Sequence, residues 1–289
     1  GQHQLLSQRK DDSEVEPHVE KVDDISLYAR KMQTMIDNSD CTKVVQVGAN
    51  DGCINDPIYE VVMRNMDKTK VLLIEPQSNI LEHLEKNYAL HPEARIANYA
   101  VGPDALLSLY RIKPAYYGLF TKRYLHDSPN YRVPSGFSSF DKKHVVKHAE
   151  GNLPKNTNVE DAIEKLEVPS YDLLTILEAA SWEERQIDIL QIDAEGMDDK
   201  VIYSCNIEVT RPQLINFERA HLPKEAYKDL CVYLSSLGYA LYNYSNLDTL
   251  AVRKVSSSLD GENVVVNDVP RQQAVQELGL LGAPVSEAG

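Results

Sequence analysis

Cysteine is scarce in this sequence, and the few cysteines are scattered along it. They are Cys41, Cys53, Cys205 and Cys231, and no two of them form a C-x-x-C pair. This spacing excludes a disulfide framework and a cysteine zinc centre, and it predicts four reduced thiols.

Basic residues are also in deficit. Lysine and arginine total 30 against 44 acidic residues, which gives a formal net charge of −14. No basic stripe interrupts this acidic surplus, and an acidic surface repels polyanions. We therefore expect no nucleic-acid partner.

Long hydrophobic runs are missing as well. No apolar segment approaches the length of a membrane span, and no signal peptide is visible. We expect a cytoplasmic protein without a membrane span, of undefined oligomeric state. The sequence opens with Gly1 rather than Met, so an anchor or a neighbouring domain could have been trimmed.

The most informative stretch that is present reads V-V-Q-V-G-A-N-D-G-C-I-N, at residues 44–55. Its first four residues predict a buried parallel strand, and Gly48 and Gly52 predict a tight turn before an amphipathic helix. The next apolar run, residues 70–76, ends in Glu75. An acidic residue at the tip of a second strand is where a ribose lies in nucleotide-type α/β folds.

The turn lacks the glycines of a dinucleotide site. In the pattern G-x-G-x-x-G, the second and third glycine positions are occupied by Asn50 and Cys53. Asp51 and Asp56 add negative charge where a pyrophosphate would bind. These carboxylates suit an amine or a sulfonium, so the electrostatics favour S-adenosylmethionine over NAD.

The remaining pattern predicts an α/β fold with a doubly wound, mostly parallel sheet and a late antiparallel strand. Further strands are expected at 95–101, 106–112, 186–193 and 213–218, with a closing hairpin at 239–244 and 249–253. The sequence divides into a polar acidic arm at 1–24, an α/β domain at 25–254 and a tail at 255–289. Residues 113–168, rich in proline and tyrosine, are expected to form an inserted cap.

Candidate catalytic groups follow the fourth and fifth predicted strands. Asp193 and Glu195 come after the fourth strand, and Glu218 and His221 after the fifth. Ligands bind at this carboxyl edge of a doubly wound sheet. His144, in the cap, is a further candidate.

Each candidate has an ordinary structural alternative. Glu195 can cap the following helix, Glu218 can pair with an arginine, and His221 can be a surface histidine. The carboxylates can also hold a divalent cation such as magnesium or calcium, but no metal signature is present and no metal ligand is assigned.

Three segments together resemble the FkbM family of S-adenosylmethionine-dependent methyltransferases: V-Q-V-G-A-N-D-G at 45–52, L-L-I-E-P at 72–76 and I-D-I-L-Q-I-D-A-E-G at 187–196. The segments F-S-S-F-D at 137–141 and D-T-L-A at 248–251 are similar too. The resemblance covers about residues 40–255. It implies a seven-stranded, Rossmann-like class I methyltransferase domain and O-methylation of a sugar or natural product.

The resemblance also implies roles for single residues. Those matching the cofactor loop, which holds the methionine part, are Gly48, Asn50, Asp51 and Gly52. Glu75, with Pro76 after it, matches the ribose acid; Ala100 and Val101 match the adenine wall; Asp193 faces the cofactor.

The hypothesis is therefore an S-adenosylmethionine-dependent O-methyltransferase with a small-molecule or glycan acceptor. The tyrosine-rich cap suits a sugar or polyketide face, and equally a peptide. One alternative is a nonenzymatic binding module on a decayed methyltransferase scaffold. An NAD-linked oxidoreductase is a third hypothesis, which the missing glycines disfavour.

Overall fold

The computed structural model describes residues 17–182 and 185–254. The predicted tail at 255–289 lies outside the described residues, as does the predicted arm up to residue 16. The rest of that arm is described, and it contains a short strand, β1 (Val19–Lys21).

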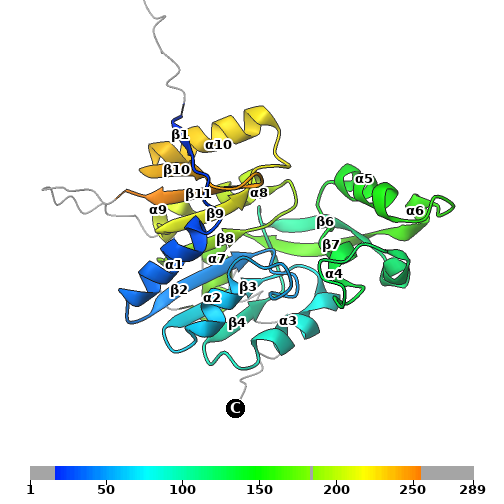
Figure 1. The fold of residues 1–289 in the computed structure, drawn as a ribbon, viewed down its shortest axis with the longest axis horizontal. Coiled ribbons are helices and arrows are strands. Elements are labelled where there is room, and N and C mark those ends of the chain that lie inside the picture. The colour runs from blue at the N-terminus through cyan, green and yellow to red at the C-terminus, as the bar shows by residue number, and fades with distance from the viewer. Residues whose placement is uncertain (1–16, 183–184, 255–289) are drawn as a thin grey trace, which may run out of the picture.

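The centre of the molecule is an eight-stranded sheet (Figure 1) with the order β1-β10-β11-β9-β8-β2-β3-β4. Beyond β1, its strands are β2 (Thr42–Val47), β3 (Thr69–Ile74), β4 (Ala94–Ala97), β8 (Ile189–Ile192), β9 (Leu214–Glu218), β10 (Tyr239–Asn243) and β11 (Asp248–Arg253). Strand β11 runs antiparallel to both neighbours, and all other pairs are parallel. This confirms the predicted doubly wound sheet with a late antiparallel strand, to which β1 adds an eighth strand beside β10.

Two helical layers cover the sheet because its central strands are apolar on both faces. In β2, Val44 packs with α1 (Leu27–Asp37), α2 (Tyr59–Arg64) and α3 (Leu81–Tyr88), whereas Val45 packs with the opposite layer. That layer comprises α7 (Leu173–Ala179), α8 (Asp198–Tyr203), α9 (Ile207–Thr210) and α10 (Lys224–Ser236). Alternate side chains of a strand point to opposite faces, so each layer receives one set.

A second, three-stranded sheet joins the cap to the main domain. Strand β7 (Ile163–Tyr171) lies between β6 (Ala105–Ile112), which is antiparallel to it, and β5 (Ala100–Val101), which is parallel. The predicted single strand at 95–101 was wrong: the chain leaves the main sheet after β4 and enters the second sheet as β5. Helix α7 follows at Leu173, because β7 extends to Tyr171.

The cap itself has a separate core. It contains η2 (Pro114–Leu119), α4 (Arg132–Ser135), α5 (Lys142–Asn152) and α6 (Val159–Ala162). Helices α5 and α6 project away from the main sheet in Figure 1, whereas α4 lies between them and the main domain. Ile112, Phe120 and Val145 are buried together inside it. Helix α5 begins where the Asp141 carboxylate accepts the backbone N–H of Lys143, a standard N-cap.

A further 3₁₀ turn, η1 (Ser78–Ile80), connects β3 to α3. Within the described ranges, no helix is both long and apolar enough to cross a membrane.

Candidate active site

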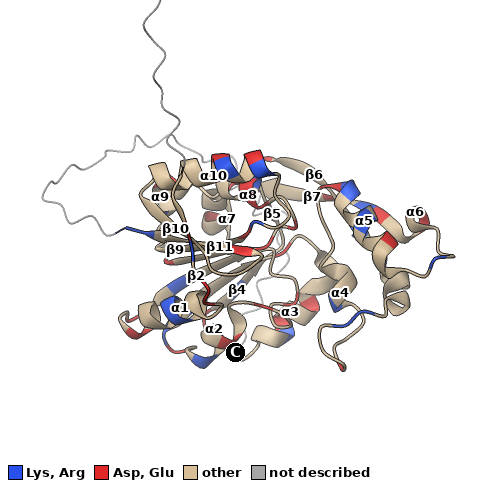
Figure 2. Cartoon of the chain, turned by 45° about the horizontal axis from the view of Figure 1, so that its top comes forward, with Lys and Arg blue, Asp and Glu red and all other residues tan. Residues whose placement is uncertain are grey.

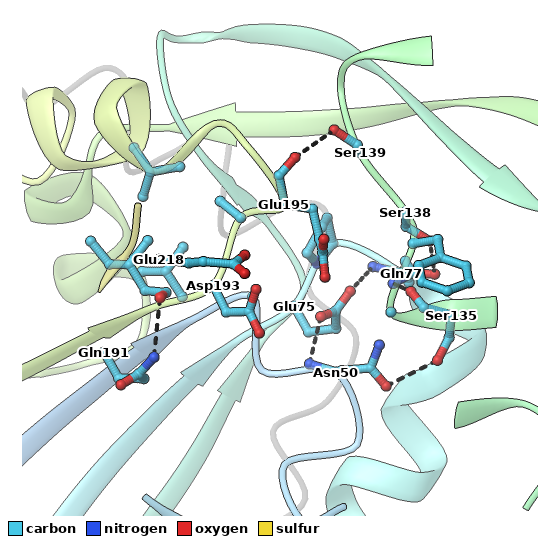
Figure 3. A pocket seen from close by; sticks show the side chains of 18 of the residues that line it. Asn50, Glu75, Gln77, Ser135, Ser138, Ser139, Gln191, Asp193, Glu195 and Glu218 are labelled. Carbon is cyan, nitrogen blue, oxygen red and sulfur yellow. Dashed lines mark hydrogen bonds between the residues drawn. The ribbon is translucent and has the colours of Figure 1, made fainter. Parts of the chain in front are cut away.

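A cavity of about 600 Å³ opens at the carboxyl ends of β2, β3, β8 and β9 and is covered by the cap (Figure 3). Strand order reverses between β2 and β8, which is where ligands bind in doubly wound sheets. The predicted site residues that line it are Gly48, Asn50, Glu75, Pro76, Ala100, Val101, Asp193, Glu195, Glu218 and His221. Asp51 and Gly52 are absent from the lining.

The turn after β2 depends on its first glycine. Gly48 has φ +76°, and a Cβ at this position would lie 1.9 Å from the carbonyl oxygen of Asp193. The tips of β2 and β8 can approach this closely only because Gly48 lacks a side chain. Asn50 also has a positive φ, of 50°, a conformation that asparagine tolerates better than most residues.

Glu75 is buried at the end of β3 and is held by two backbone groups. Its Oε2 accepts the N–H of Asn50 at 2.7 Å, and its Oε1 accepts the N–H of Gln77 at 2.8 Å. Burial raises the pKa of this carboxyl, and the two N–H donors oppose that rise. Each carboxylate oxygen accepts one backbone N–H, which leaves further lone pairs for the neighbouring Gln77 side chain and for a ligand.

Asp51 and Gly52 lie beneath the cavity wall. The Asp51 carboxylate accepts the N–H groups of Cys53 and Ile54, both at 3.1 Å, and its other oxygen accepts the Tyr131 hydroxyl at 3.1 Å. A Cβ on Gly52 would contact Leu84 of α3 at 2.5 Å. These contacts maintain the shape of the loop, and direct cofactor contact by either residue stays a prediction.

The end of α4 and the segment after it close the cavity over the cofactor loop. The Ser135 hydroxyl donates to the Asn50 side-chain oxygen at 3.1 Å, and the Gln77 amide donates to the Ser135 carbonyl at 3.2 Å. The Ser138 hydroxyl donates to Gln77 Oε1 at 2.7 Å. Sequence reasoning did not assign these three side chains to the site, although the motif F-S-S-F-D at 137–141 marked the segment.

Carboxyl groups gather on the opposite wall, where Figure 3 shows Asp193, Glu195 and Glu218 pointing into the same space. Burial raises the pKa of Asp193 to about 6 and that of Glu218 to about 8, and neighbouring carboxylates add to the rise. Burial and the charge of Asp193 raise the pKa of Glu195 too. Asp248 is a further acidic residue of the lining. This wall therefore favours a cation and disfavours an anion.

Asp198 fixes the spacing of these strand tips. Its carboxylate accepts the N–H of Ala194 at 3.2 Å and the N–H of Glu218 at 3.0 Å. The backbones after β8 and β9 are therefore joined by one fully buried side chain. Sequence reasoning missed this role, because it depends on the contact between the two strand tips.

Polar side chains also lie on the cavity floor, inside strands that the sequence pattern predicted as buried. The Asn216 amide of β9 donates to Gln191 Oε1 of β8 at 2.9 Å, and the Tyr244 hydroxyl donates to Asn216 at 2.9 Å. Sequence reasoning missed these residues because the flanking apolar residues dominated the pattern.

His221 lies beside two histidines of α5. Its Nε2 is 3.8 Å from Glu218 Oε1, and the ring contacts those of His144 and His148. Burial lowers the pKa of all three imidazoles, that of His148 to about 4. The structure thus brings the predicted candidates His144 and His221 together and adds His148, which sequence reasoning missed.

Most of the chain matches one known protein family. The family described as the methyltransferase FkbM domain matches residues 46–241, which span the cofactor loop, the cap and the strand tips. No relative among curated protein sequences matches the chain.

Several solved structures are distantly similar to the chain. A precorrin-6y C5,15-methyltransferase from Geobacter metallireducens GS-15 is 9% identical, with 78% of this chain and 88% of that chain covered and a TM-score of 0.36. The fibrillarin pre-rRNA processing protein of Methanococcus jannaschii is 12% identical, with coverages of 74% and 67% and a TM-score of 0.37. The 23S rRNA methyltransferase ErmE is 11% identical, with coverages of 80% and 71% and a TM-score of 0.34.

Proposed function

The chain belongs to the FkbM family of methyltransferases, and on that premise we propose that it is an S-adenosylmethionine-dependent O-methyltransferase acting on a hydroxyl of a sugar or natural product. The observation that carries the proposal is the arrangement around Glu75. This carboxylate, anchored by two backbone N–H groups, lines the same cavity as the carboxyl groups at the tips of β8 and β9.

The residues present fit the cofactor. The free lone pairs of Glu75 suit the two ribose hydroxyls, and Ala100 and Val101 offer small apolar side chains for an adenine. The bare backbone of Gly48 permits close approach of the methionine part. The cavity volume of about 600 Å³ lies within the usual range for small-molecule sites.

Charge supports the same cofactor. S-adenosylmethionine supplies an electrophilic methyl group on a positively charged sulfur. Asp193, with a pKa of about 6, is ionised at neutral pH and stabilises such a positive charge, and the cation in turn favours the ionised forms of Glu195 and Glu218. The same carboxyl groups disfavour the pyrophosphate of a dinucleotide. The cofactor loop likewise carries Asp56, another lining residue, where a dinucleotide site requires a neutral turn.

Glu218 is our candidate for the general base. Its pKa of about 8 lies close to neutral pH, so its ionised form is a stronger base than an ordinary carboxylate, and the positive charge of the cofactor would favour that form. Its side chain lines the cavity. In the proposed reaction the acceptor oxygen bonds to the methyl carbon as the carbon–sulfur bond breaks, and the hydroxyl proton passes to Glu218. Asp193 and Glu195 would orient the acceptor.

The acceptor class is inferred from the cap. Tyr124, Phe137 and Phe140 line the cavity, and aromatic rings stack well on the apolar face of a sugar ring or polyketide. The net charge of −14 argues against a nucleic-acid acceptor.

The test is a calorimetric titration of the chain with S-adenosylmethionine, S-adenosylhomocysteine and NADH. We expect the first two to bind and NADH not to bind. Glu75→Ala should weaken S-adenosylmethionine binding by about 100-fold, because two charge-assisted hydrogen bonds are lost. Glu82→Ala, which removes an exposed glutamate of α3, should leave the affinity unchanged.

Transfer is tested separately, with radiolabelled methyl groups and a panel of sugars and hydroxylated natural products. Binding without transfer to any acceptor would favour the nonenzymatic binding module. An unchanged affinity of Glu75→Ala for S-adenosylmethionine would show that Glu75 does not bind the cofactor, and would contradict the proposed site.

A further inference from the structure

Three imidazole rings meet at the border between the cap and the main domain. His144 and His148 are four residues apart on α5 and therefore share one face of that helix, while His221 follows β9. The ring centroids lie 4.4 Å apart for His144 and His148, 5.2 Å for His144 and His221, and 5.8 Å for His148 and His221.

The ring nitrogens converge as well as the rings. One nitrogen from each histidine lies within 4.8 Å of the others. Nε2 of His144 is buried and makes no hydrogen bond, although Oε2 of Glu195 is 3.2 Å away. A buried ring nitrogen that makes no hydrogen bond costs free energy, and a metal ion bound beside it would supply the missing interaction.

We propose that His144, His148 and His221 bind a divalent transition-metal ion of the zinc type. Nitrogen ligands about 2.1 Å from a tetrahedral ion lie ~3.4 Å from one another, so the rings need to close by little more than ~1 Å. Three histidines leave the fourth position open, as in catalytic zinc sites. That position faces the cavity, because His148 and His221 are part of its lining.

The ligand set decides which ion is expected. Imidazole nitrogens prefer zinc, cobalt, nickel or copper, whereas magnesium and calcium prefer oxygen. A second group, Glu195, Glu218 and His221, also converges and would suit magnesium or manganese. We favour the three histidines because Nε2 of His144 lacks a hydrogen bond there.

The ion would have two effects. It would tie α5 of the cap to the loop after β9, and thereby hold the cavity closed. If the proposed methyl transfer also holds, the ion would lower the pKa of an acceptor hydroxyl beside Glu218. The binding site itself does not depend on that reaction.

The test uses the full chain without an added polyhistidine segment, stripped with a chelator and titrated with Co²⁺ alone. We expect one equivalent to bind, with visible absorption bands typical of tetrahedral cobalt, and thermal unfolding to shift upward. His148→Ala and His221→Ala should each weaken binding by about 100-fold or more, and Zn²⁺ should displace the cobalt.

The matched control is His126→Ala, which removes an exposed histidine of the cap outside this group. It should bind Co²⁺ as the parent does, and circular dichroism should show that all variants are folded. Failure of the parent to bind Co²⁺, or equal binding by the His148 and His221 variants, would overturn the proposal.

Binding of the metal ion by the second group, Glu195, Glu218 and His221, would give a different set of results with the same variants. Tight Mg²⁺ binding that is lost in Glu218→Gln but kept in His148→Ala would replace the histidine site with the carboxylate group. Because Co²⁺ and S-adenosylmethionine are titrated separately, loss of one proposal leaves the other standing.

Discussion

At the residue scale, the cavity depends on the contact between Gly48 and the backbone of Asp193. The missing side chain allows two strand tips to meet, and the positive φ is a conformation that L-residues with a Cβ adopt at a cost. Gly238 has a similar φ, of +88°, but nothing lies within 4 Å of a Cβ there. A substitution at Gly238 would therefore introduce backbone strain alone, whereas one at Gly48 would add a steric clash.

Gly48→Ala should destabilise the chain more than Gly238→Ala. We expect about 1–2 kcal/mol for Gly238→Ala from the left-handed backbone alone, and at least twice that for Gly48→Ala. Urea unfolding of both variants measures the difference. If both variants lost the same free energy of unfolding, the tips of β2 and β8 would be able to move apart without a loss of stability.

Asp56 illustrates a charge that burial disfavours. Its Oδ1 accepts the N–H groups of Ile58 and Tyr59, its Oδ2 accepts the Gln46 amide at 2.6 Å, and burial raises its pKa. Gln46 Oε1 is buried without a hydrogen bond. An asparagine at position 56 would retain the N–H contacts, and after a flip of the Gln46 amide it would donate to Oε1.

Asp56→Asn should therefore stabilise the chain at neutral pH, by on the order of 1 kcal/mol. A carboxyl whose folded pKa is raised contributes full stability below its unfolded pKa and loses it as pH rises through the folded pKa. The advantage of the variant should grow as pH increases from about 4. Urea unfolding at several pH values measures it, and exposed Asp67→Asn should show no such trend.

At the element scale, helix α4 is what connects the cap to the cofactor loop. Nε of Arg132 lies 3.3 Å from Asp51 Oδ1 and donates to the Ile54 carbonyl at 3.0 Å. Both charged side chains are buried. Removing one partner leaves the other charge without compensation, which costs more than the ion pair contributes.

Arg132→Met should cost about 3–5 kcal/mol, because the Asp51 carboxylate remains buried. The double variant with Asp51→Asn should cost less than the sum of the two single variants. Urea unfolding of the four proteins gives the coupling free energy. Strict additivity would show that the loop and α4 are energetically independent.

At the scale of the whole molecule, acidic residues outnumber basic ones by 44 to 30, and six of them line the cavity: Asp56, Glu75, Asp193, Glu195, Glu218 and Asp248. Figure 2 shows basic residues on α5 of the cap and acidic residues in the loops beside β11, at the carboxyl edge of the main sheet. This distribution attracts cations toward the cavity. At neutral pH S-adenosylmethionine carries one net positive charge, and S-adenosylhomocysteine carries none.

Salt should therefore weaken binding of S-adenosylmethionine more than that of S-adenosylhomocysteine. Raising the ionic strength from about 20 mM to about 500 mM should lower the affinity for the charged cofactor roughly fivefold, because screening shortens the reach of the acidic field. Calorimetry of both ligands in both buffers measures this. The same salt effect on both would show that the field does not contribute to cofactor selection.

Residue type and spacing were enough to predict most strands of the main sheet, the family and the position of the cavity, although not the short strand β1. Buried strands such as β2 and β3 are short apolar runs, and the glycine turn and Glu75 follow them directly in the chain. These features are local, so spacing and residue type are enough to predict them. The doubly wound topology then places consecutive strand tips at one edge.

The side chains that meet at that edge come from distant parts of the chain, and their contacts follow from the packing of the elements. It turned Asp51 inward toward Arg132, divided the predicted strand at 95–101 between two sheets, and brought His144 and His148 against His221. The periodicity of one segment does not contain these contacts, because they depend on how the cap packs on the main domain. The residues that bind and react are set by that packing, whereas the fold is set by patterns within each element.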